Sequence, residues 1–165
     1  MKFLLPVLAV LIISSCKKPE EYPIEPVITF KSISTSRNAQ GFDQKMYVVL
    51  NFTDGDGDIG YLTSGLNDPI FDDPNSPYYN NYVADIFRME NGNWVPYPTI
   101  LPLAGRLPYI TPEGKNKAVK GEIVCEFAVP LQAHQDTFRL DVFIYDRGLH
   151  KSNTVSTDPF ILNTQ

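Results

Sequence analysis

Three aspartates that could bind a metal ion stand at alternating positions, directly after a run that alternates like a strand. Asp54, Asp56 and Asp58 are separated by Gly55 and Gly57. Glycine adopts a positive φ without steric cost, so this loop can bend tightly and direct several carboxylates at one centre. Hard oxygen ligands gathered in this way suit Ca²⁺, whereas anions packed together without a cation repel each other. The sequence therefore predicts a calcium-binding loop at the end of a β-strand.

The loop does not follow the EF-hand pattern. Counted from Asp54, an EF-hand requires Gly at the sixth position and Glu at the twelfth, where this chain has Ile59 and Gly65. We expect the metal to stiffen the loop and to take no part in a reaction. The alternative interpretation is an acidic surface turn, because Asp-Gly steps form turns without any metal.

The N-terminus has the order of a secretory signal peptide. Residues 1–15 contain one lysine, a short apolar run and then small residues, and the run is too short to span a membrane. Residues 13–16 resemble the bacterial lipobox, in which the signal is cut before the cysteine. The resemblance implies that Cys16 carries acyl chains, each CH₂ of which adds about 0.8 kcal/mol to membrane attachment. We expect a lipid-anchored protein of the cell envelope.

Residues 16–26 comprise the lipidated cysteine and a polar, proline-rich stretch that predicts an extended tether. A charged segment with acidic residues after the cysteine resembles the surface-export signal of Bacteroidota lipoproteins. Here two lysines come first and Glu20 and Glu21 follow Pro19, so the match is loose. We expect attachment to the outer membrane, with the periplasmic face and the cell surface as alternatives.

Composition limits the remaining possibilities. The formal net charge is −5 at pH 7 and no basic cluster is present, which argues against a nucleic-acid partner. Residues 27–165 suffice for one domain with its own core. Cys125 is in phase with Ile123 and Phe127, which predicts a small buried hydrophobe and not a catalytic thiol.

Short alternating segments separated by turn residues follow one another along the chain. Asn-Gly at residues 91–92 lies between two of them and is the strongest short hairpin signal. Outside the signal peptide we find no amphipathic helix. The expected strands cover residues 26–33, 45–53, 82–90, 94–97, 106–110, 118–129, 136–146 and 152–162. The alternation in 136–146 predicts a buried row of Phe138, Leu140, Val142 and Ile144. They indicate an all-β domain, an immunoglobulin-like antiparallel β-sandwich of about seven strands.

This topology suggests a remote fourth ligand. In immunoglobulin-type folds the loops after the second and sixth strands lie at the same end. Asp146 ends a late strand and is therefore expected to join the aspartate loop. Arg147 would be a counter-charge or a solvated residue, or, without a metal, would hold the loop through an ion pair. The long irregular stretch at 61–81 adds carboxylates that could complete a metal shell or be solvated: Asp68, Asp72 and Asp73.

Aromatic residues provide a second candidate site. Tyr78, Tyr79, Tyr82 and Trp94 could form a platform for a sugar or a peptide, although aromatic side chains more often pack in cores and loops. Neither histidine has a partner motif, and no nucleophile elbow, zinc spacing or phosphate loop is present. A carboxylate pair for glycoside hydrolysis would be spatial and not sequential, and nothing in the sequence favours one.

The lipobox, the F-x-D-x-D-G-D-I-G loop at residues 52–60 and the D-R-x-x-N/H-x-S-N segment within 145–155 together resemble uncharacterised lipoproteins of Bacteroidota. The resemblance implies a secreted immunoglobulin-like domain and supplies no activity. We expect a non-enzymatic binding or structural module with a calcium-stiffened loop and a protein or glycan partner. The alternatives are a carbohydrate-binding accessory lipoprotein of a glycan-uptake system and a hydrolase with scattered carboxylates.

Overall fold

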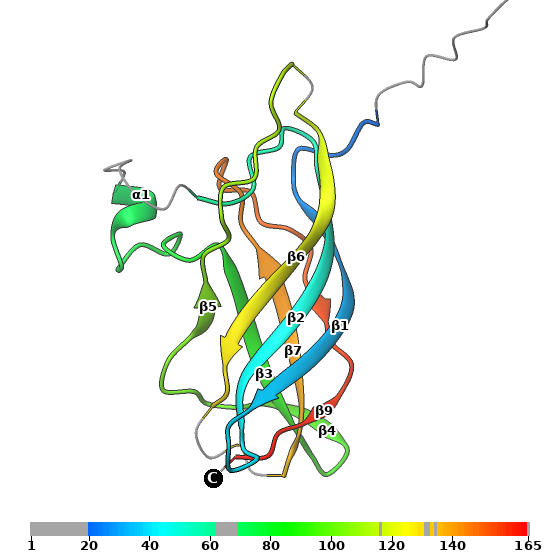
Figure 1. The fold of residues 1–165 in the computed structure, drawn as a ribbon, viewed down its shortest axis with the longest axis vertical. Helices are drawn as coiled ribbons and strands as arrows, with labels where there is room; N and C mark the ends of the chain where they lie inside the picture. The colour runs from blue at the N-terminus through cyan, green and yellow to red at the C-terminus, as the bar shows by residue number, and fades with distance from the viewer. Residues whose placement is uncertain (1–19, 62–68, 116, 131–132, 134, 165) are drawn as a thin grey trace, which may run out of the picture.

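A computed structural model of the chain describes residues 20–61, 69–115, 117–130, 133 and 135–164. They form an antiparallel β-sandwich whose two sheets pack face to face (Figure 1). The predicted all-β, immunoglobulin-like antiparallel sandwich is confirmed in its architecture. The expected signal peptide and Cys16 lie outside the described residues. Within those residues, no helix has the length and apolarity needed to cross a membrane.

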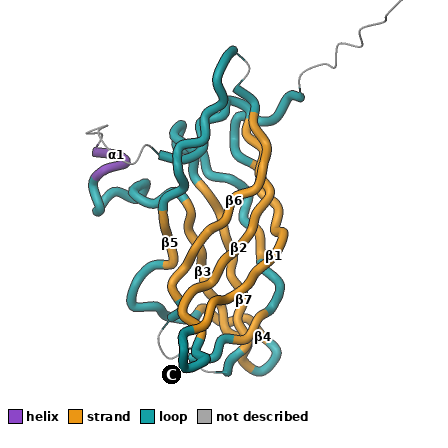
Figure 2. Tube along the Cα trace, in the orientation of Figure 1, coloured by secondary structure: helices purple, strands orange, loops and turns teal. Residues whose placement is uncertain are grey.

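The first sheet has the order β1-β2-β6, with β1 at Val27–Arg37, β2 at Asp43–Asp54 and β6 at Val119–Ala128. The second has the order β4-β3-β7-β8, with two further short strands paired to β3 and β7. Its strands are β3 (Tyr82–Glu90), β4 (Asn93–Pro96), β5 (Leu103–Gly105), β7 (Thr137–Ile144), β8 (Val155–Ser156) and β9 (Phe160–Ile161). Figure 2 shows these strands joined by long loops, with one helical turn, α1 (Pro69–Asp72), beside the sandwich.

Alternating side chains from both sheets build the core. The inward residues of β7 are fully buried as the sequence predicts, and Cys125 lies on the buried face of β6 with Ile123 and Phe127. Burying one large apolar side chain contributes about 1.5–3 kcal/mol, so these rows hold the two sheets together. The fully buried row on β7 is Phe138, Leu140, Val142 and Ile144.

Turn residues set the strand boundaries. The predicted hairpin is present, with Asn91 at φ 50° and Gly92 at φ 82° between β3 and β4. The prediction of a strand at 106–110 is wrong. The strand β5 ends at Gly105, and beyond it Pro108 and Ile110 form only isolated bridges. Proline has no N–H to donate to a ladder. The last expected strand is likewise divided into β8 and β9 by a segment containing Pro159.

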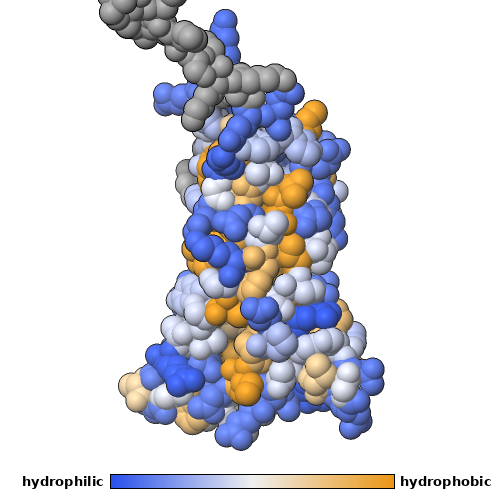
Figure 3. Space-filling view, turned by 90° about the vertical axis from the view of Figure 1, so that its right-hand side faces the viewer, coloured by the Kyte–Doolittle hydropathy of each residue, from blue (hydrophilic) through white to orange (hydrophobic). Residues whose placement is uncertain are grey.

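The two ends of the sandwich differ in what they carry. Strands β2 and β7 both end at the upper end in Figure 1, where the first described residues also lie, and the C-terminus lies at the opposite end. From the side of β1, hydrophobic residues form a broken strip along the long axis with hydrophilic residues between them (Figure 3). That side is therefore a mixed surface and not a continuous apolar one.

Candidate metal centre

The aspartate loop begins at Asp54, the last residue of β2, and glycines shape it. Gly57 has φ +64° and Gly60 has φ +80°, both in the left-handed region. A Cβ at Gly57 would collide with the carbonyl oxygen of Lys117, and one at Gly60 with that of Pro108. The two glycines therefore provide both the turn and the room for the backbone at Pro108 and Lys117 to pack directly on the loop.

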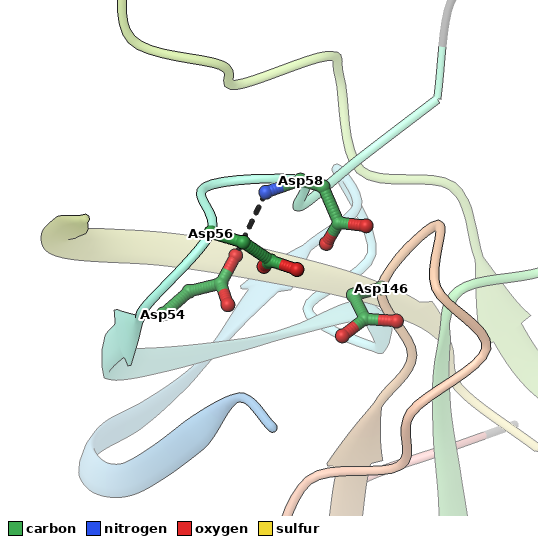
Figure 4. A group of neighbouring side chains, drawn as sticks. All are labelled: Asp54, Asp56, Asp58 and Asp146. Atoms are coloured by element: carbon green, nitrogen blue, oxygen red, sulfur yellow. Dashed lines mark hydrogen bonds between the residues drawn. The ribbon is translucent and has the colours of Figure 1, made fainter. Parts of the chain in front are cut away.

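The structure brings the four predicted carboxylates together. Asp54, Asp56, Asp58 and Asp146 each offer a carboxylate oxygen, and these atoms lie within 4.8 Å of one another. Figure 4 shows three side chains from the loop after β2 facing Asp146 from the turn after β7. The turn is held there by a bridge between Asp146 and Ile59. The four carboxylates could hold a metal ion.

Two oxygens of this cluster are buried without a partner. Asp54 and Asp146 are fully buried, Asp58 is half-buried and Asp56 is exposed. Oδ2 of Asp54 accepts a hydrogen bond from the backbone N–H of Asp58 at 2.9 Å. Among the described residues, Oδ1 of Asp54 and Oδ1 of Asp58 have no hydrogen-bond partner. A buried unpartnered polar atom costs about 1–3 kcal/mol, more when charged, and a cation between the carboxylates would remove that cost.

Burial and mutual repulsion oppose the ionised state of the cluster. Burial, with repulsion from the other three carboxylates, raises the pKa of Asp54 to about 7. Burial also raises the pKa of Asp58, and the charge of Asp146 adds to this while Arg147 works against it. A divalent cation would reverse this balance by stabilising the carboxylates as anions.

His150 holds the carboxylate of Asp146 in place. The backbone N–H of His150 donates to Oδ1 of Asp146 at 2.8 Å, and its Nδ1 lies 2.9 Å from Oδ2. Burial raises the pKa of Asp146, and these bonds to His150 work against that rise. No sequence motif identifies Asp146 as the partner of His150; the available signal was the separation of the two residues by four positions.

The side chain of Arg147 holds the aspartate loop by hydrogen bonds to the backbone of the loop. Its guanidinium donates to the carbonyl oxygens of Ile59 at 3.1 Å and Gly60 at 2.7 Å, and to Oγ1 of Thr111 at 2.6 Å. It also stacks on the ring of Tyr109, with 4.3 Å between the guanidinium carbon and the ring centroid. Within the described residues its side-chain hydrogen bonds go to these oxygens and not to a carboxylate, so the alternative of an Arg–Asp ion pair is not what holds the loop.

The other expected carboxylates serve elsewhere. Asp72 lies 3.7 Å from Arg106, and Asp73 accepts hydrogen bonds from Asn75. Neither belongs to the four-aspartate cluster. Asp68 lies outside the described residues.

The four aromatic candidates do not share one surface. Tyr82 is buried in the core, where its hydroxyl donates to the carbonyl oxygen of Glu126 at 2.9 Å. Trp94 lies on β4, where Arg139 stacks on its ring at 5.0 Å. Tyr78 packs edge-on against Tyr145.

Tyr79 lies at a separate cavity. Arg106 is held between the rings of Tyr61 and Tyr79, at 4.9 Å from each centroid, and donates to the carbonyl oxygens of Phe71 and Tyr79. The buried hydroxyl of Tyr61 has no hydrogen-bond partner among the described residues. The cavity has a volume of about 410 Å³ and is lined by Tyr61, Asp72, Tyr79, Arg106, Leu107 and Pro108.

The single cysteine of the described domain is unsuited to catalysis. Cys125 is fully buried, and burial raises the pKa of its thiol to about 12. A nucleophilic cysteine needs an accessible thiolate, which this environment disfavours.

Comparisons of the chain with known protein families, curated proteins and solved structures found no match. The function must therefore be inferred from the geometry and electrostatics of the four-aspartate cluster.

Proposed function

We propose that the protein is a non-enzymatic lipoprotein module of the cell envelope, in which Ca²⁺ bound by Asp54, Asp56, Asp58 and Asp146 stiffens one end of the sandwich. One observation carries this proposal. The carboxylate oxygens left unpartnered and buried on Asp54 and Asp58 belong to a cluster with four converging acidic groups. Such an arrangement is unfavourable without a cation and favourable with one.

The number of carboxylates favours Ca²⁺ among divalent cations. Ca²⁺ binds oxygen at about 2.3–2.6 Å, so two ligands on opposite sides of the ion lie about 4.6–5.2 Å apart. The four carboxylate oxygens lie within 4.8 Å of one another, which is compatible with such a shell. Mg²⁺ keeps several waters and is usually bound through one or two carboxylates, so a set of four suits Ca²⁺ better.

The expected role of the ion is structural. Its ligands come from the loop after β2 and the turn after β7, and the backbone at Pro108 and Lys117 is packed on the same loop. A cation would join two segments that are distant in sequence and would stiffen the loop against which a third part of the chain is packed. Asp54 and Asp146 are fully buried, which suits a stiffening ion better than one that must receive a substrate.

The expected lipid anchor gives this end of the domain an orientation. The described chain begins at the end of the sandwich that carries the metal centre (Figure 1). If Cys16 carries acyl chains, the metal centre lies on the membrane-proximal side. The opposite end is then free to meet a protein or glycan partner.

Thermal unfolding with Ca²⁺ and with a chelator tests the metal site. A cation that binds only the native state raises the unfolding midpoint as its concentration exceeds Kd. We expect this rise in the wild type and its loss in Asp56→Asn, which removes an exposed ligand without opening the core. Asp85→Asn, an exposed carboxylate on β3, is the matched control and should retain the rise. Equal midpoints with Ca²⁺ and with chelator in the wild type would contradict the proposal.

A second candidate function is glycan binding at the cavity beside Tyr79. The observation in its favour is the cavity of about 410 Å³, which falls within the usual range of about 300–1,000 Å³ for ligand pockets. Arg106 and Asp72 offer polar groups to a hydroxylated ligand, and Tyr79 offers an aromatic ring. Glycan-array binding that is lost in Tyr79→Ala and kept in Trp94→Ala would support this site. The reverse pattern would move the search to the face of β4.

A further inference from the structure

The N-terminal segment packs directly against the metal loop. A Cβ at Gly55 would collide with the carbonyl oxygen of Tyr22 and would lie 2.6 Å from that of Pro23. Both are backbone atoms, so neither can swing aside as a flexible side chain can. Gly55 stands between the two ligands Asp54 and Asp56, so the N-terminal segment lies against the part of the loop that must hold the cation.

One further interaction locates the start of the segment. Glu20 forms an ion pair with Lys120 at 2.6 Å, and Lys120 lies opposite Thr53 of β2. This pair is exposed to solvent, so it adds little to the stability of the docked segment, and the backbone contact at Gly55 is the closer constraint.

Together these contacts place the N-terminal segment against the metal loop. The segment starts near Lys120 and passes over Gly55, between the ligands Asp54 and Asp56. At Gly55 the backbone of the segment packs directly against the loop, with no room for even a Cβ atom between them. A change in the position of the loop must therefore change the fit of the segment.

We propose that cation binding at the four-aspartate centre and docking of residues 20–25 stabilise each other, so that the cation controls whether the N-terminal segment is held against the domain. This inference rests on the proposed metal site. Without a cation, repulsion between Asp54, Asp56 and Asp58 favours a more open loop, which displaces Gly55 from the segment. Coupling between two binding events is reciprocal, so a released segment must also weaken cation binding.

The coupling would set how far the domain stands from its anchor. With residues 20–25 docked, only residues 17–19 separate Cys16 from the domain, and these four Cα–Cα steps span at most roughly 14 Å. With the segment released, the eleven steps from Cys16 to the start of β1 can span roughly 37 Å. Bound cation would therefore hold the domain close to the lipid surface, and its loss would lengthen the tether.

Hydrogen exchange of the full chain, with Ca²⁺ and with chelator, tests this coupling. In the wild type we expect Ca²⁺ to slow exchange in residues 20–26 by at least about fivefold, the lower end of typical coupling. The β3–β4 hairpin at the opposite end should change less. In Gly55→Ala we expect the Ca²⁺-dependent protection to be lost, and the Ca²⁺ affinity measured by calorimetry to fall by at least about fivefold.

Gly121→Ala is the matched control for this substitution. Gly121 lies on β6 and has no left-handed φ, and a Cβ there would approach only the ring of Phe52, at 3.3 Å. This variant should keep both the protection and the affinity. If Gly55→Ala does not fold, the wild-type comparison with the hairpin still decides the question.

The outcomes separate this inference from the proposed function. Ca²⁺ binding with unchanged exchange in residues 20–26 would overturn the coupling and leave the metal site in place. Equal affinity in Gly55→Ala and wild type would do the same. Absence of Ca²⁺ binding to the wild type would overturn both.

Discussion

Substituting Asp54 by Asn should change stability in opposite directions with and without Ca²⁺. In the metal-free protein, the carboxylate of Asp54 is buried beside three other aspartates, and the pKa of Asp54 is raised to about 7. Above that pH the native state must carry an unfavourable anion. Asn removes the charge, keeps an oxygen to accept the hydrogen bond from the N–H of Asp58, and adds an NH₂ group that can donate to neighbouring carboxylates.

The size of the effect follows from the pKa. A pKa raised from 3.8 to about 7 corresponds to about 4 kcal/mol, at about 1.4 kcal/mol per pH unit. This is a ceiling, because Asp56 is exposed and the cluster can relax toward water. We expect the metal-free variant to gain about 1–2 kcal/mol in free energy of unfolding, which raises the midpoint by about 2–8 °C.

Saturating Ca²⁺ should invert the order. A cation at about 100 times its Kd stabilises the native state by about 2.7 kcal/mol, and the variant forfeits most of this because it lacks one anionic ligand. Thermal unfolding at about pH 8, with chelator and with excess Ca²⁺, measures both arms. A variant that is less stable than the wild type under both conditions would refute the argument that Asp54 is strained without a cation.

Three further predictions concern pH, Arg147 and the loop glycine. In chelator, the free energy of unfolding should fall as pH rises from about 4 to about 7, because native Asp54 keeps a proton that the unfolded chain releases. Denaturant titrations across this pH range should show the fall, and Ca²⁺ should abolish it. Arg147→Lys should lower the free energy of unfolding by about 1–3 kcal/mol, because lysine cannot bond both carbonyl oxygens and Thr111 together. If Arg139→Lys lowers it as much in the same urea titration, the bonds of Arg147 to the loop are not what stabilises the domain. Gly60→Ala should lower the midpoint far more than Gly92→Ala, because both have a left-handed φ but only Gly60 is packed against Pro108; equal losses would show that backbone strain alone decides.

Patterns within single strands made much of the fold predictable. The alternation in β7 correctly assigned its buried row, and Asn-Gly correctly placed the turn after β3. The alternation within β3 could have excluded Tyr82 from the aromatic candidates, because Tyr82, Ala84 and Ile86 share the buried face of that strand. The error at 106–110 arose because Pro108 interrupts the ladder that its neighbours could have formed.

For the metal centre, residue spacing and strand topology predicted the candidate ligands but not the contacts that hold them in place. Alternating Asp and Gly indicated the loop, and the common end of two strands indicated Asp146. The bonds from Arg147 to the loop carbonyls and the contact of Gly55 with Tyr22 depend on how distant segments fold onto one another. No local sequence pattern predicts contacts between distant segments, so the sequence alone did not reveal them.

Calorimetric titration of Ca²⁺ into the full chain decides whether the four aspartates bind a cation. We expect one class of saturable site, with affinity reduced at least about tenfold, or about 1.4 kcal/mol, in Asp146→Asn. Asp72→Asn, which alters a carboxylate outside the cluster, should bind as the wild type does. No saturable binding to the wild type, or equal affinity in Asp146→Asn, would contradict the account.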